Sequence, residues 1–133
     1  MKFQELCKQL ETKIQNSYEQ GVTLEDAERL AGEFLYAQLQ VSTELKKADL
    51  DSRLRKSGVK AVRSAIYLDI VQKADKKPTE TQIESMINAD KIVQDEQEAF
   101  DRAEVDRNEL ERYYQIFQNA HIHYRGVSKG RFE

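Results

Sequence analysis

Apolar residues recur at steps of three and four from the start of the chain. They are Phe3, Leu6, Leu10, Ile14 and Tyr18. This spacing places them on one face of an α-helix and predicts a helix from Phe3 to about Glu19. Gly21 follows, and a glycine there is typical of a helix C-terminal cap, because glycine adopts positive φ angles without a Cβ penalty.

A second amphipathic pattern starts near Thr23, whose hydroxyl can accept a hydrogen bond from an amide at a helix N-terminus. Glu25 and Asp26 place negative charge at the positive end of the helix dipole. One face then carries Ala27, Leu30, Ala31, Phe34, Leu35, Gln38, Val41 and Leu45. We expect this helix to continue to Ala74 with a kink or break at Ser57-Gly58, because glycine costs about 1 kcal/mol in a helix interior.

Residues 75–79 are the predicted linker, and they contain the single proline, Pro78. The residue before a proline is biased away from helix. Thr79 and Thr81 each begin a capping-box motif, so a long third helix is expected over residues 80–125. Residues 126–133 read as a frayed basic tail.

The third predicted helix carries a heptad seam that extends over more than five repeats. Strict alternation of three and four indicates a left-handed supercoil. The seam consists of Met86, Ala89, Val93, Glu96, Phe100, Ala103, Arg107, Leu110, Tyr114, Phe117, His121 and Tyr124. We expect copies of the chain to associate through Val93, Phe100, Leu110, Tyr114 and Phe117. The alternative is that this helix packs on the first two helices of its own chain, and both contacts can coexist.

The composition supports an all-α fold, a bundle of long helices in one oligomeric domain spanning residues 1–133. Five glycines and one proline in 133 residues are too few for the frequent turns of a β-sandwich or barrel. No stretch approaches the ~20 apolar residues of a membrane span. The first residues lack the apolar core of a signal peptide, and the single cysteine, Cys7, cannot form an internal disulfide. A cytoplasmic protein is therefore expected.

Charge is segregated along the chain. Residues 46–77 contain ten basic and four acidic residues, a net charge of +6, whereas residues 80–112 contain eleven acidic and four basic residues, a net charge of −7. The basic segment is either a surface for an anionic partner or the neutralising counterpart of the acidic segment. The charge pattern leaves both interpretations open.

Five residues of the basic segment form the best candidate site. Arg53, Lys56, Lys60, Arg63 and Tyr67 are separated by alternating steps of three and four. On a continuous helix they make one stripe, which we call the basic stripe. Its cations can meet successive phosphates of a nucleic acid, and a tyrosine ring can stack on a base. The alternative is an ordinary solvated helix face, and a break at Gly58 would remove Arg53 and Lys56 from the stripe.

Other chemistry has little support in the sequence. The aromatic residues near the end of the third helix fit core or oligomer packing. His121 and His123 diverge on a helix and cannot share one metal ion. Glycine-rich phosphate loops, nucleophile elbows and Cys-x-x-Cys motifs are absent from the sequence. We expect a protein that is not an enzyme and that has no metal or cofactor.

Three places in the chain carry motifs of a known family. They are Leu35-Tyr36 with Leu39 and Leu45-Lys46-Lys47, then Val59-Lys60-Ala61-Val62-Arg63 with Tyr67, and finally Ile87-Asn88-Ala89-Asp90-Lys91. In order and spacing, the stretch from Leu24 to Arg125 resembles the UvsY-type recombination mediators of tailed bacteriophages. The second motif resembles the family's basic motif, and the third resembles its entrance into a long terminal helix.

This resemblance implies a ring-forming homo-oligomer that binds single-stranded DNA. It further implies that the protein loads a RecA-like recombinase onto strands coated by single-strand-binding protein, in the host-cell cytoplasm if a phage encodes it. Lys60 matches the family's DNA-contacting position. Arg63 departs from the pattern, because the family's second basic residue stands closer to the lysine. The rival hypothesis is a structural or scaffold oligomer without nucleic-acid binding.

Overall fold

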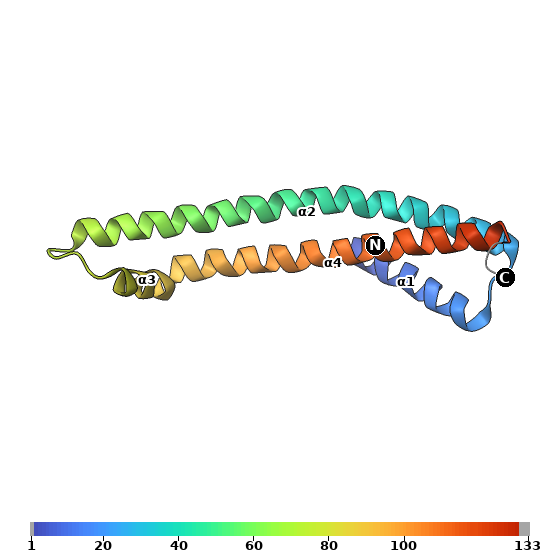
Figure 1. Ribbon diagram of the computed structural model, residues 1–133, viewed down its shortest axis with the longest axis horizontal. Coiled ribbons are helices and arrows are strands. Elements are labelled where there is room, and N and C mark those ends of the chain that lie inside the picture. The colour runs from blue at the N-terminus through green and yellow to red at the C-terminus, as the bar shows by residue number, and fades with distance from the viewer. Residues whose placement is uncertain (1, 131–133) are drawn as a thin grey trace. The chain divides into compact units, whose positions relative to one another are not determined.

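The computed structural model describes residues 2–130, which form four α-helices and contain no strand (Figure 1). The helices are α1 (Phe3–Gln20), α2 (Leu24–Lys73), α3 (Glu80–Ala89) and α4 (Lys91–Ser128). The all-α prediction is confirmed. The chain divides into two compact units, of which the first joins the chain up to Lys46 with the chain from Glu109 onward. The second unit is Lys47–Asn108.

Local capping chemistry fixes the ends of α1 and α2 where the sequence predicts them. Gly21 has a φ of 77°, in the region that favours glycine, and its N–H donates to the Ser17 carbonyl at 2.9 Å. The Thr23 hydroxyl oxygen accepts from the Asp26 N–H at 3.1 Å and caps the start of α2. Both predicted caps are confirmed.

The expected break at Gly58 is wrong, because α2 continues without interruption to Lys73. Position 58 lies close to α4, where an added Cβ would stand 3.4 Å from Glu96 Oε2. The next residue, Val59, is buried. The modest helix cost of one glycine is outweighed by the packing of the residues beside it.

The expected single helix over residues 80–125 is also wrong, because Asp90 separates α3 from α4. Its backbone is extended, with a ψ of 130°, and its Oδ1 accepts from the N–H groups of Ile92 at 2.9 Å and Val93 at 3.2 Å. Aspartate favours this N-cap geometry over a helix interior. The predicted capping box is confirmed at Thr79, which exchanges hydrogen bonds with Gln82.

The predicted frayed tail begins too early. Helix α4 continues to Ser128, and Gly126 is buried. Gly130 ends the described chain with a φ of 73°. The rest of the predicted tail, residues 131–133, lies outside the described residues.

The core of the first unit forms where α1, the start of α2 and the end of α4 pack together. Its buried residues are Cys7, Leu10, Ala27, Leu30, Ala31, Phe34, Ala37, Val41, Tyr113, Phe117, Ala120 and Tyr124. Aromatic rings dominate it, with Phe34 stacked on Tyr124 at 5.7 Å between centroids. The His121 Nδ1–H donates to the Ala31 carbonyl at 2.9 Å, so this polar seam residue has a partner on α2.

The second unit has a smaller core, in which α3 packs on α2. Ile83, Ile87 and Val93 are buried there, against Val62, Ile66, Tyr67, Ile70 and Val71. Polar contacts join α2 to α4 beside it. Ser52 Oγ donates to Glu104 Oε1 at 3.1 Å, and Arg107 Nε donates to Asp49 Oδ1 at 2.9 Å. These polar contacts, together with Ile83 and Ile87, determine which face of α2 packs against α3 and α4.

Candidate nucleic-acid interface

The continuous α2 keeps all five residues of the basic stripe on one helix, but it does not leave them equally accessible. Arg53, Lys56 and Lys60 are exposed, whereas Arg63 and Tyr67 are half-buried. The difference arises because Val59, Val62 and Ile66 pack inward on the adjoining face. The stripe therefore divides into an open part and a part that borders the core.

Lys56 and Lys60 form the most accessible part of the stripe. Neither ammonium group has an ion-pair or hydrogen-bond partner within residues 2–130. Arg53 Nη2 lies 3.0 Å from Asp49 Oδ2, but its side chain is 77% exposed. An exposed pair of this kind contributes ~0.2–1 kcal/mol, so a phosphate can replace the aspartate at little cost. Three cations are thus open to an anionic ligand.

Arg63 and Tyr67 are engaged by carboxylates and an amide of α3. Arg63 forms an ion pair with Glu84, and its Nη1 donates to Asn88 Oδ1 at 3.1 Å. The Tyr67 hydroxyl donates to Glu80 Oε1 at 3.3 Å. These contacts hold two members of the stripe against α3 in the free protein. Sequence reasoning missed them, because nothing in the spacing predicts where α3 docks.

Glu80 also receives Lys77 from the linker, with 3.4 Å between Nζ and Oε1. The hydrogen bond to Glu80 raises the pKa of Lys77 above its ordinary value. The acidic start of α3 is thus paired with both the linker and α2. Its negative charge lies beside the half-buried end of the basic stripe.

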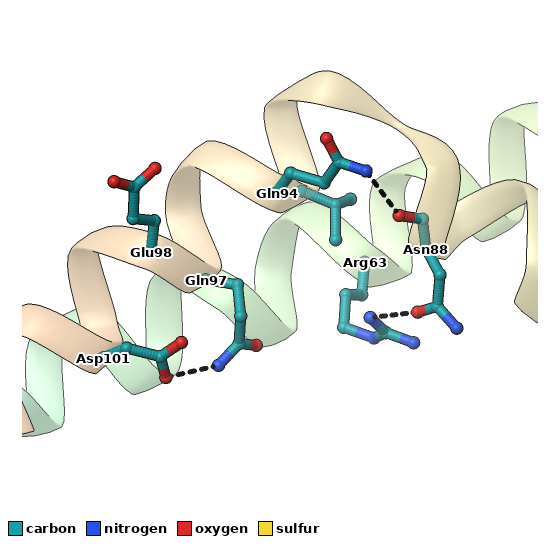
Figure 2. Close-up of a pocket in the computed structure, with 7 residues that line it drawn as sticks. Arg63, Asn88, Gln94, Gln97, Glu98 and Asp101 are labelled. Atoms are coloured by element: carbon teal, nitrogen blue, oxygen red, sulfur yellow. Dashed lines mark hydrogen bonds between the residues drawn. The ribbon is translucent and has the colours of Figure 1, made fainter.

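An open pocket of the second unit lies at the junction of α2, α3 and α4 (Figure 2). Gln94 Nε2 donates to the Asn88 carbonyl at 3.1 Å, and Gln97 Nε2 donates to Asp101 Oδ1 at 3.0 Å. Its lining consists of Arg63, Asn88, Val93, Gln94, Gln97, Glu98 and Asp101. One cation faces two carboxylates here, so the pocket has no net attraction for a phosphate group.

The residues predicted to form an oligomer interface are covered to different degrees by their own chain. Val93 is 3% exposed and Phe117 is 0% exposed, each inside its unit's core, while Phe100, Leu110 and Tyr114 are half-buried. Packing on the helices of the same chain, the alternative to oligomerisation, therefore accounts for the burial of Val93 and Phe117. Association through the α4 seam stays a prediction.

No group of three or more histidine, cysteine or acidic side chains within residues 2–130 is arranged to hold a metal ion. None of the helices described combines the length and apolar character of a bilayer crossing. Tyr113, Phe117 and Tyr124 are core residues, in line with the packing interpretation of the aromatic cluster.

Comparisons with protein-family models, with curated proteins and with solved structures give no match. The resemblance to phage recombination mediators stays a prediction from three short motifs. Within the basic motif, Lys60 is exposed, whereas Arg63 is half-buried.

Proposed function

We propose that the protein binds single-stranded DNA through the exposed cations of α2. We further propose that it acts as a recombination mediator, helping to load a RecA-like recombinase onto DNA coated by single-strand-binding protein. The observation that carries the proposal is the state of Lys60. This residue matches the DNA-contacting position of the resembled family, and it is exposed without an ion-pair partner among the described residues.

The magnitude of binding by one chain follows from the number of available cations. Lys56 and Lys60 are one helical turn apart, about 6 Å along the axis, so both can contact one strand. With Arg53, three phosphates are neutralised, and log K should fall with log salt with a slope of about −2 on single-stranded DNA. Such a site is weak alone. In a ring-forming homo-oligomer, repetition of the site raises its effective concentration and increases the affinity for one strand.

The exposed acidic residues of α4 support the proposed protein partners. Asp95, Glu98, Asp101 and Asp106 are exposed in the second unit. An acidic surface repels DNA and attracts basic protein surfaces, so contacts with a recombinase or with single-strand-binding protein are expected here. DNA and protein partners then use different helices of one unit.

A salt titration with a fluorescently labelled oligothymidine tests DNA binding. The variant Lys56→Ala with Lys60→Ala should bind about tenfold more weakly, and its salt slope should be shallower by about 1.4, because two phosphate contacts are lost. The matched control is Lys8→Ala with Lys91→Ala, which removes the same charge from exposed positions outside the stripe. The control should stay close to the wild type.

Two outcomes would contradict this site. One is equal affinity in the stripe variant and the control, and the other is a wild-type protein that does not bind DNA even at low salt. The mediator step is measured separately, as the rate at which a RecA-type recombinase assembles on DNA precoated with single-strand-binding protein. A protein that binds DNA without accelerating assembly is not a mediator.

The second candidate is a structural or scaffold oligomer without nucleic-acid binding. It is favoured by the engagement of Arg63 and Tyr67 with α3, which leaves two of the five stripe residues half-buried and already paired. The same titration separates the candidates, because a scaffold shows no salt-dependent affinity for the oligonucleotide.

A further inference from the structure

In the second unit, α2 carries large apolar side chains on a face that the chain leaves uncovered. Leu50 is 59% exposed, Leu54 is 63% exposed and Leu68 is 56% exposed. Single exposed leucines are common on protein surfaces, but these three share one line along the helix. The complete line is Leu50, Leu54, Ser57, Ala61, Ser64 and Leu68, and all six residues are exposed. We call it the outer seam.

The outer seam points away from the unit's own core. At 100° per residue, it lies roughly 160° around the helix from Val59, Val62 and Ile66, which pack inward. This part of α2 therefore carries leucines and small residues on the face opposite its packed face, and only the packed face is covered. A helix with apolar residues on both sides is typical of an element that packs on both sides.

The spacing of the outer seam identifies the kind of surface that fits it. Its steps alternate between four and three, the heptad period with which one helix packs on another in a coiled coil. We propose that the outer seam binds the outer seam of a second copy of this chain, with the two α2 helices parallel and in register. Each leucine then meets its equivalent, and the small residues between Leu54 and Leu68 let the helices approach closely.

The charges beside the outer seam favour the parallel direction. In a parallel pair, Arg53 and Lys60 on one flank face the opposite flank of the second copy, where Gly58 and Ala65 are uncharged. In the antiparallel pair that aligns the whole seam, with Leu50 opposite Leu68, Lys60 instead faces Lys60 of the second copy. Like charges directly opposite each other destabilise that arrangement.

The parallel pair is also compatible with the open part of the basic stripe. Lys56 is not a seam residue, and the small side chain of Ala65 and the glycine at position 58 leave Lys60 open to solvent. Two copies then present two sets of cations to one strand. The association itself requires no DNA, so it is tested in DNA-free buffer and its failure is distinguishable from a failure of DNA binding.

Sedimentation equilibrium of the full chain measures the association. The wild type is expected to dimerise, or to form multiples of dimers, at micromolar concentration. Leu50→Gln with Leu54→Gln should weaken the dimer at least tenfold. The matched control is Ile92→Gln with Val105→Gln on α4, at 59% and 64% exposure. The control should associate like the wild type, and circular dichroism should show the same helicity in all three proteins.

Two results of this comparison overturn the proposal. A monomeric wild type at tens of micromolar shows that no second copy covers the seam, and equal effects of the two double variants show that the seam is not the interface.

Direction and register are tested by disulfide formation. In the parallel pair, Ser57→Cys places thiols at equivalent seam positions of the two copies. Their Cβ atoms can then come within the ~4 Å that a disulfide needs. Mild oxidation should link most of this variant into covalent dimers. Ser85→Cys, on the exposed surface of α3, should link only slowly, and the wild type controls for Cys7. A dimer that persists while Ser57→Cys fails to cross-link overturns the parallel arrangement.

Discussion

Neutralising Glu84 should strengthen DNA binding, because this carboxylate occupies Arg63 in the free protein. The substitution Glu84→Gln keeps the size and shape of the side chain and removes only its charge. Helix α3 should remain in place, because its attachment to α2 depends chiefly on the buried Ile83 and Ile87. The change therefore isolates the competition between Glu84 and a phosphate for one guanidinium group.

The size of the effect follows from the exposure of the pair. The Arg63 side chain is 31% exposed and that of Glu84 is 59% exposed, so solvent screens their attraction. Pairs of this kind contribute at most about 1 kcal/mol, which corresponds to an affinity gain of up to about fivefold when the competition is removed. If Arg63 then contacts a phosphate, the salt slope should become steeper by about 0.7.

The assay is the same oligothymidine titration, repeated over a series of salt concentrations. Asp95→Asn is the matched control, because it neutralises a carboxylate that is 60% exposed and paired with Lys91 on α4. A general effect of net charge should appear equally in both variants. Equal affinities and slopes for the two variants would refute the reasoning. Arg63 would then not reach DNA, and the site would consist of Arg53, Lys56 and Lys60.

Two further predictions concern stability. Burial, with Glu109 and Glu11 nearby, raises the pKa of the Cys7 thiol from 9.0 to about 11. Because the folded state holds this proton more tightly, the free energy of unfolding should fall by up to about 3 kcal/mol as the pH rises from 9 towards 11. Denaturant unfolding of the wild type and of Cys7→Ala across this pH range measures how much of the fall in unfolding free energy is due to the thiol. Asp90→Ala removes the cap of α4 and should cost about 1 kcal/mol in urea unfolding, whereas Asp90→Asn should retain most of it. Equal costs for the two substitutions would contradict the capping role.

The starts and ends of helices were predictable where one residue's local chemistry decides them. Gly21 ends α1 because of its backbone freedom, and Thr23 and Thr79 begin the next helices with their own hydroxyl groups. These contacts span only a few residues, so the sequence contains all the partners. The all-α fold was also predictable from the sequence, because few glycines or prolines interrupt the helical spacing of the apolar residues.

Other features depend on partners distant in the sequence and could not be read from spacing. Gly58 stays helical because neighbouring residues pack against the rest of the unit. Arg63 and Tyr67 are less accessible than the rest of the basic stripe, because α3 packs beside them. The heptad spacing continues across Asp90, although α3 ends there and α4 begins. A capping residue interrupts the helical backbone but leaves the sequence spacing of the apolar residues unchanged.

A heptad spacing specifies a packed face, but it does not specify which chain supplies the covering helix. On α4 the seam was conspicuous, and the chain's own helices bury its residues Val93 and Phe117. On α2 the outer seam is hard to recognise from the sequence, because apolar residues on two opposite faces give no single amphipathic stripe. A face with seam spacing and no cover within its own unit is the better candidate for a second copy. We therefore expect self-association through α2 more than through α4. Because α2 also carries the exposed Lys56 and Lys60, the proposed pairing and the proposed DNA binding would reinforce each other.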